Sequence, residues 1–285
     1  MRAIFLAMVW CAMLGACAAH DVNGTANSAS RGAAPRVVTL VPSFADDMYA
    51  IGAGSQIVAV SAFTDAPQAK LLPRIADSSS VDSEAILELR PSVVIGIPAQ
   101  GRLTEPLRRA HVGVVLLPDD SYSEIFENLQ TIGTLTGHRR EANATIARLR
   151  RETARLHAQT KAYLRHPSVF VVLGSAPIWT AGADSYIATL IALAGGANAA
   201  SDLHGAYGQY SAEALVRHQP DLLVADAATH LDAALDREPW RSLRAVRLHR
   251  VYSVDPDIIE RPGPSYNQGL QWLVSRLMPL AVATP

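Results

Sequence analysis

One segment near the middle of the chain restricts the possible folds most. Residues 138–166 contain no glycine and no proline, although the whole chain has 18 glycines and 17 prolines. Apolar and threonine side chains recur there every three or four residues, at Ile146, Leu149, Thr153, Leu156, Thr160 and Tyr163. This spacing predicts one long amphipathic helix over 138–166. At about 1.5 Å per residue the helix would be roughly 40 Å long, the size of a whole lobe.

The segments on both sides of this helix alternate between strand and helix patterns. Apolar, β-branched runs typical of buried parallel strands lie at 37–41, 57–60, 93–95, 112–117, 169–173, 222–225 and 251–254. Helical patterns separate them, among others at 121–137 and 186–194, and a closing helix is expected at 268–278. This alternation predicts an α/β fold with parallel sheets.

Parts of the two halves look like copies of one another. Segment 83–95 aligns without gaps with segment 212–224, so that Glu84 matches Glu213. In each copy a short helical pattern is followed by a proline and then by an apolar strand pattern. The repetition predicts that both halves contain the same helix-and-strand unit.

We therefore predict two similar lobes, 36–137 and 167–285, joined by the helix 138–166. Parallel sheets bind their ligands beyond the carboxyl ends of the strands. Two lobes that face each other place this edge of each sheet in a cleft between them.

The N-terminal end has the pattern of an exported protein. Arg2 precedes an apolar run that ends in small residues, which predicts a secretory signal over 1–16. Leu14-Gly15-Ala16-Cys17 resembles the bacterial lipoprotein signal, in which the cysteine becomes acylated after cleavage. The alternative is ordinary cleavage near Cys17 without a lipid, but this would leave an unpaired thiol in an oxidising compartment. Residues 17–35 are then a lipidated cysteine and a flexible tether to a membrane.

Composition and motifs disfavour several other functions. The formal net charge of −1 gives no support for binding of nucleic acid. The sequence has no GxSxG elbow, Walker loop, HExxH or CxxC motif, which disfavours an enzyme. The nine histidines form no pair at metal-ligand spacing, so we expect neither a metal site nor a cofactor. We expect the protein to be a monomer.

From residue 36 to residue 280 the chain resembles the periplasmic binding proteins for cobalamin and ferric siderophores. The resemblance is carried by 36–43, by the repeated unit with Leu89-Arg90-Pro91, and by Arg261-Pro262-Gly263-Pro264. It implies two lobes joined by a single rigid helix that limits their closure. It also implies a periplasmic protein that delivers a small molecule to the permease of an ABC importer and its ATPase subunits.

The resemblance is strongest to the cobalamin binders and implies a set of ligand contacts. Phe63, Trp179 and Tyr207 match aromatic positions of the cleft, and Asp257 and Arg261 match two polar positions. Aromatic walls bury a broad, semi-rigid ligand, and a few polar groups orient it. The alternative for the aromatics is core packing, although we expect all three in loops that follow strands. The alternative for Arg261 is an ion pair with Asp257 or Glu260.

Cobalamin or a related corrinoid is therefore the expected ligand. A ferric siderophore or heme is the alternative within the same class. The heme-binding relatives use a tyrosine before the Glu84 helix, and 75–81 contains none. An enzyme, or an accessory envelope protein without a ligand, is the alternative of another class.

Glu84 and Glu213 have two possible roles. In the family that the chain resembles, one glutamate on each lobe pairs with arginines of the permease. Two carboxylates far apart on one face would orient such docking by charge. The alternative is local, because both glutamates lie in the first turn of a helix pattern, where a carboxylate favours the helix dipole.

Overall fold

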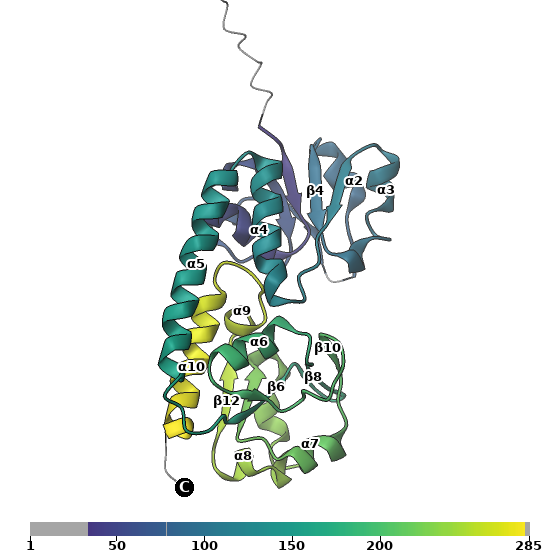
Figure 1. The fold of residues 1–285 in the computed structure, drawn as a ribbon. Coiled ribbons are helices and arrows are strands. Elements are labelled where there is room, and N and C mark those ends of the chain that lie inside the picture. The colour runs from purple at the N-terminus through teal and green to yellow at the C-terminus, as the bar shows by residue number, and fades with distance from the viewer. Residues whose placement is uncertain (1–33, 78, 283–285) are drawn as a thin grey trace, which may run out of the picture. The chain divides into compact units, whose positions relative to one another are not determined.

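The structure is a computed structural model that describes residues 34–77 and 79–282 (Figure 1). The predicted signal segment and Cys17 lie outside these ranges. Within the described ranges, no helix combines the length and the apolar character that a membrane crossing requires. The predicted fold class is confirmed, because two α/β lobes lie along one long helix.

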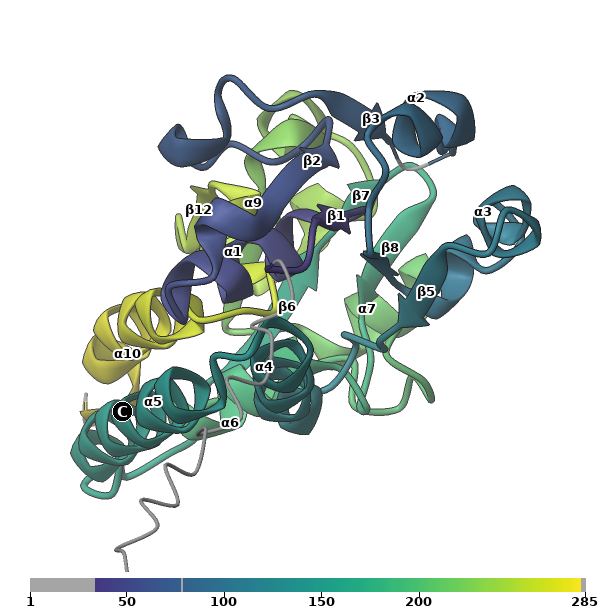
Figure 2. The same ribbon diagram turned by 90° about the horizontal axis from the view of Figure 1, so that it is seen from above.

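The N-terminal lobe is built on a five-stranded parallel sheet in the order β3-β2-β1-β4-β5. Its strands are β1 Val37–Thr39, β2 Ile57–Ser61, β3 Arg74–Ala76, β4 Val93–Gly96 and β5 Gly113–Leu116. Its helices are α1 Pro42–Ala50, α2 Ser83–Glu88, α3 Glu105–Arg109 and α4 Tyr122–Thr136, with short 3-10 turns η1 Gly54–Gln56, η2 Pro67–Ala69 and η3 Pro98–Gln100. Seen from above, α4 and α2 lie on opposite sides of this lobe (Figure 2).

The C-terminal lobe contains a four-stranded parallel sheet in the order β12-β11-β6-β9 and a small antiparallel sheet β10-β8-β7. Its strands are β6 Ser168–Val172, β7 Gly174–Ser175, β8 Ile178–Ala181, β9 Ala197–Asn198, β10 Tyr207–Gln209, β11 Leu222–Asp226 and β12 Val251–Val254. Its helices are α6 Tyr186–Leu193, α7 Ala212–His218, α8 Arg244–Arg247, α9 Pro256–Ile259 and α10 Tyr266–Val282, with 3-10 turns η4 Ala227–Thr229, η5 Leu231–Ala234 and η6 Trp240–Ser242.

The repeat seen in the sequence has a structural counterpart in each lobe. Helix α2 leads into β4, which pairs with β1, and helix α7 leads into β11, which pairs with β6. Between helix and strand, Arg90 and Gln219 occupy equivalent positions and both adopt the left-handed backbone conformation, with φ of 45° and 46°. A left-handed residue is a common way to end a helix. The same turn therefore ends the same helix in both lobes.

The long helix α5 runs from Arg139 to Thr160 along both lobes, which at 22 residues makes it about 33 Å long. Its buried stripe includes Ile146, Leu149 and Leu156, as predicted. The prediction that it continues to residue 166 was wrong. Leu164 turns away and donates its backbone N–H to the carbonyl of Ala281 in α10, so the chain docks on α10 instead of extending the helix.

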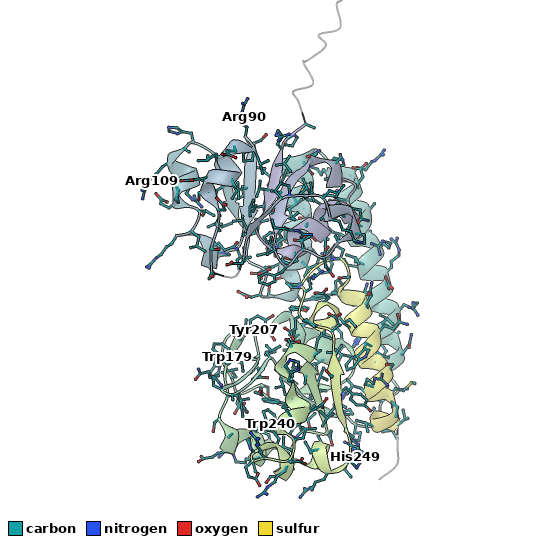
Figure 3. All side chains as sticks on the ribbon, turned by 180° about the vertical axis from the view of Figure 1, so that it is seen from behind. Arg90, Arg109, Trp179, Tyr207, Trp240 and His249 are labelled. Carbon is teal, nitrogen blue, oxygen red and sulfur yellow. The ribbon has the colours of Figure 1, made fainter. Side chains whose placement is uncertain are left out.

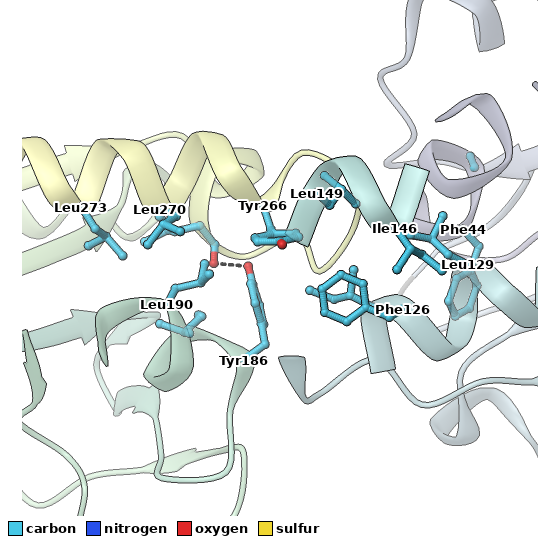
Figure 4. Packing of buried hydrophobic residues seen from close by; sticks show 14 of the residues in the cluster. Phe44, Phe126, Leu129, Ile146, Leu149, Tyr186, Leu190, Tyr266, Leu270 and Leu273 are labelled. Atoms are coloured by element: carbon cyan, nitrogen blue, oxygen red, sulfur yellow. Dashed lines mark hydrogen bonds between the residues drawn. The ribbon is translucent and has the colours of Figure 1, made fainter. Parts of the chain in front are cut away.

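One hydrophobic cluster joins the two lobes (Figure 4). It contains Phe44 and Phe126 from the N-terminal lobe, Leu149 from α5, and Tyr186 and Leu270 from the C-terminal lobe. Each of these side chains has at most 6% of its surface exposed. A polar contact reinforces the junction, because the Tyr266 hydroxyl lies 2.6 Å from Thr153 Oγ1 and 3.1 Å from the Tyr122 hydroxyl. The lobes therefore share one core.

Gly269 of α10 tests how tightly this junction is packed. A methyl group there would lie 2.2 Å from the carbonyl oxygen of Ile258 in α9. Gly269→Ala gains about 0.5–1 kcal/mol from helix propensity, but overpacking costs about 1–3 kcal/mol. We expect a net loss of unfolding free energy in urea titrations, whereas the exposed Ser275→Ala should change it by less than about 0.5 kcal/mol. A stabilised Gly269→Ala variant would show that α9 is free to move.

Candidate ligand-binding cleft

The lobes face each other across a hollow at the carboxyl ends of their parallel strands. Ser43, Phe63 and Asp119 follow β1, β2 and β5, and Asp257 follows β12. These residues belong to a pocket of about 460 Å³ with walls from both lobes. The prediction of a cleft at this edge of the two sheets agrees with this arrangement.

Two further pockets adjoin the first one. A pocket of about 250 Å³ shares Asp119, Glu260 and Pro262 with it. A pocket of about 560 Å³ shares Asp257 and Arg261 with it. We call the three together the cleft, and its size is suited to a ligand larger than a single metal ion or amino acid.

Two of the three predicted aromatics line this cleft. Phe63 lies in the turn after β2, has 57% of its surface exposed and lines the central pocket. Tyr207 is 37% exposed and lines the pocket of about 250 Å³. Trp179 is 40% exposed, but it is not among the described side chains that line the three pockets. The core-packing alternative is excluded for the exposed rings of all three.

The expectation that Trp179 and Tyr207 lie in loops was wrong, because they lie on β8 and β10. These strands are antiparallel, with Tyr207 opposite Ala181 and Gln209 opposite Trp179. Side chains alternate along a strand, so Trp179 and Tyr207 share one face of the small sheet. Figure 3 shows Tyr207 closer to the N-terminal lobe than Trp179. Trp179 therefore extends the aromatic surface away from the cleft.

Arg261 forms an ionic link between the lobes. Its side chain is only 14% exposed, and its Nη1 lies 2.8 Å from Asp65 and 3.3 Å from Asp46, both in the N-terminal lobe. Its Nη2 pairs closely with Asp257, which was the alternative expected from the sequence. The hydrogen bond from Arg261 lowers the pKa of Asp65. Burial raises the pKa of Asp46, although Arg261 opposes this effect.

Three more carboxyl groups in the cleft hold their protons unusually strongly. Burial raises the pKa of Glu260 to about 8, and the nearby Asp226 and Asp257 add to this. Burial raises the pKa of Asp119 to about 6, although the Ser43 hydroxyl donates to it at 3.3 Å. Burial also raises the pKa of Asp257 to about 6.

Glu260 differs from the other acidic groups that line the cleft in having a buried oxygen without a partner among the described residues. Its Oε1 atom is buried and has no hydrogen-bond partner among residues 34–77 and 79–282. Sequence reasoning considered Glu260 only as a partner for Arg261, and it did not identify Asp119. The signal for Asp119 was its position directly after β5, at the edge where the cleft was expected. Among the described residues, no three His, Cys, Asp or Glu side chains are grouped as a metal site.

Glu84 and Glu213 are exposed in the first turns of α2 and α7, and neither is among the described residues that line the three pockets of the cleft. Other residues cap these helices: Asp82 accepts from the Ala85 N–H at 3.0 Å and Ser211 from the Ala214 N–H at 3.3 Å. Neither glutamate has a hydrogen-bond or ion-pair partner within the described part of the chain. Both helices therefore already have a capping side chain. The local role that is left for the two glutamates is the weaker interaction of a carboxylate with the helix dipole.

The sequence matches the periplasmic binding protein family over residues 37–258. It is 28% identical to an uncharacterized ABC transporter substrate-binding lipoprotein, YvrC of Bacillus subtilis, over 86% of this chain and 80% of that protein. It is 29% identical to the vitamin B12-binding protein of Pectobacterium carotovorum, over 86% of this chain and 89% of that protein.

Two solved structures with different ligands resemble the fold equally well. The vitamin B12-binding protein BtuF of Vibrio cholerae gives a TM-score of 0.75 at 25% identity, over 88% of this chain and 99% of that one. A periplasmic heme-binding protein from Pseudomonas aeruginosa gives 0.75 at 28% identity, over 88% of this chain and 95% of that one. Fold likeness alone therefore does not choose between these two ligands.

The raised pKa of Glu260 predicts a pH-dependent stability. Below about pH 4.5 this carboxyl is protonated in both the folded and the unfolded chain. As the pH rises towards about 8, the unfolded chain loses this proton first, so the contribution of Glu260 to stability falls. We expect Glu260→Gln to increase the unfolding free energy more at about pH 8.5 than at about pH 5 in urea titrations.

The exposed Glu127→Gln on α4 serves as the control and should show no such trend. An equal effect of Glu260→Gln at both pH values would contradict the assigned environment of Glu260.

Proposed function

The chain belongs to the periplasmic binding protein family, and from this membership we propose that it captures cobalamin or a related corrinoid and delivers it to an ABC importer. The relatives named as a substrate-binding lipoprotein and as vitamin B12-binding proteins, and a heme-binding structure of the same fold, support a substrate-binding protein of an ABC importer. Proteins of this family bind solutes and release them to a permease with ATPase subunits. This argues against an enzyme.

The observation that carries the proposal is a cleft with an aromatic side chain from each lobe. Phe63 belongs to the N-terminal lobe and Tyr207 to the C-terminal lobe, and both rings are more than one third exposed. A corrin is a broad, semi-rigid plate with a large apolar surface. Contact with a ring from each lobe would bury much of that surface, and the polar groups of the cleft would orient the ligand.

Heme is the second candidate, because a heme-binding structure shares the fold at 28% identity. The heme-binding relatives were expected to use a tyrosine before α2, and residues 75–81 contain none. Within the same proposal, a ferric siderophore remains the third candidate of this class.

We also propose a location and an anchor. The family consists of periplasmic proteins, and one relative is named as a lipoprotein. Acylation of Cys17 would hold the protein at a membrane, and the segment up to residue 35 would let it reach the permease. Mass spectrometry of the N-terminal peptide would detect the lipid on Cys17 directly.

For the permease contact we propose Glu84 and Glu213. Both carboxylates are exposed, and they belong to equivalent helices on the two lobes. Figures 1 and 2 place α2 and α7 on the side of the molecule away from α5. Two negative charges so arranged fit a permease surface with two matching arginine clusters.

Removal of either cleft ring should weaken ligand binding. We expect Phe63→Ala and Tyr207→Ala each to raise the dissociation constant for cyanocobalamin about tenfold or more, since each deletes a large buried contact. Isothermal titration calorimetry would measure this, with the exposed Leu71→Ala as an apolar control outside the pockets. Tight binding of a ferric siderophore instead of cyanocobalamin would overturn the ligand and leave the class intact.

Charge reversal on the two lobes should separate binding from transport. We expect the double variant Glu84→Arg/Glu213→Arg to bind the ligand with unchanged affinity and to lose most uptake in cells that depend on this importer. Glu88→Arg reverses an exposed charge on α2, the helix that carries Glu84, and serves as the matched control. Normal uptake in the double variant would remove the docking assignment.

A further inference from the structure

We propose that Glu260, Asp119 and Asp257 make the cleft selective for a ligand whose polar groups are amides, and against one that carries free carboxylates. The inference rests on the proposed function, because it assumes that the cleft is the binding site. It adds the polar chemistry by which that site chooses among macrocycles of similar size.

The first argument is the charge of the cleft. Among the described residues that line the central pocket, Arg261 is the only cationic side chain. Its charge is already shared by three carboxylates, at Asp46, Asp65 and Asp257. Asp119 and Glu260 add two more acidic groups to the same walls. In the central pocket a ligand carboxylate would therefore find no free cation, and it would face the like charges of Asp119 and Asp257. Among the described residues that line the other two pockets, Arg148 is a further cation, and it already faces Glu152 at 3.9 Å.

The second argument is the unsatisfied oxygen of Glu260. This side chain lines both the central pocket and the pocket that holds Tyr207, so it lies where a ligand that touches both rings must pass. Its buried Oε1 lacks a partner among the described residues, and a buried polar atom without a partner costs free energy. Because Oε1 is buried, a ligand group reaches it only when the Glu260 side chain turns towards the pocket, and a group that then completes the hydrogen bond recovers the cost.

A primary amide meets this requirement in either protonation state of Glu260. To an ionised carboxylate the amide donates its N–H. To a protonated carboxyl, which the raised pKa favours near neutral pH, it can donate its N–H and also accept the O–H. A ligand carboxylate cannot donate. It can accept the O–H of a protonated Glu260, but the second oxygen of Glu260 then remains without a donor. The geometry therefore distinguishes the two groups although they have nearly the same shape.

The two candidate macrocycles differ in this respect. The ring of cobalamin carries primary amide arms, whereas the ring of heme carries two free carboxylates. An amide arm beside Glu260 gains a hydrogen bond, and a carboxylate at the same place meets the charges of Asp119 and Asp257. The cleft thus favours the corrinoid over heme, a choice that the fold does not make.

The test compares ligands that differ by one functional group. The full chain is titrated by calorimetry near neutral pH with cyanocobalamin and with each derivative in which one ring propionamide is hydrolysed to the carboxylate. We expect at least one of these monocarboxylates to bind about tenfold or more weakly than the parent, because only an arm inside the cleft meets the acidic groups. Ferric protoporphyrin should bind weakly or not at all.

A double variant tests whether the acidic side chains cause this loss of affinity. In Asp119→Asn/Glu260→Gln the penalty on that monocarboxylate should fall to about threefold or less, since the charge of Asp119 is removed and the amide at position 260 can donate an N–H to the ligand carboxylate. Equal binding of all the corrinoids by the unaltered protein, or tight binding of ferric protoporphyrin, would overturn the selectivity. If no corrinoid binds at all, the proposed ligand itself is wrong and the selectivity fails with it.

Discussion

The geometry of the cleft depends on one continuous hydrophobic core that passes along α5 from one lobe to the other. Phe44 and Phe126 on one side and Tyr186 and Leu270 on the other belong to the same cluster. Because both lobes are packed against this shared core, the edges of their sheets cannot separate widely without exposing it to water. The walls that carry Phe63 and Tyr207 are therefore held at a nearly fixed separation. Such a pre-formed site suits a rigid, plate-like ligand, since little ordering of the protein is needed on binding.

Most of the charged side chains that line this cleft are acidic. Arg261 connects the lobes by ion pairs to Asp46 and Asp65, and within residues 34–77 and 79–282 the buried Oε1 of Glu260 has no hydrogen-bond partner. Burial then raises the pKa of Glu260 into the physiological range. Groups with strongly perturbed pKa values tend to gather at functional sites, and here they line the central pocket of the cleft. The residues that join the two lobes by ion pairs and the residues that would contact the ligand are thus parts of one charged network.

The sequence predicted the long helix, most strands and the paired lobes, because each leaves a local or repeated pattern. The regular spacing of Leu149 and Leu156 identified α5, and the alignment of Glu84 with Glu213 identified the repeated unit. Features set by distant parts of the chain were not predictable in this way. After α5 ends at Thr160, the backbone N–H of Leu164 donates to Ala281, which is far away in the sequence, and the strands that carry Trp179 and Tyr207 also pair over a long stretch of chain. The contact of Arg261 with Asp65 likewise joins residues far apart in sequence. The places of Phe63, Tyr207, Asp257 and Arg261 in the cleft were therefore inferable by resemblance, whereas the part played by Asp119 and the electrostatic environment required the structure.

The central claim is that the solute lies between the two lobes and touches a ring from each. The most direct measurement is the anomalous diffraction of cobalt in crystals of the full chain grown with cyanocobalamin, since this signal locates the metal independently of any assumption about the pose. We predict a single strong cobalt peak in the cleft, between Phe63 and Tyr207 and close to Glu260, the residue that follows α9. A peak on the outer surface of either lobe, or well-diffracting crystals without a cobalt peak at saturating ligand, would contradict it.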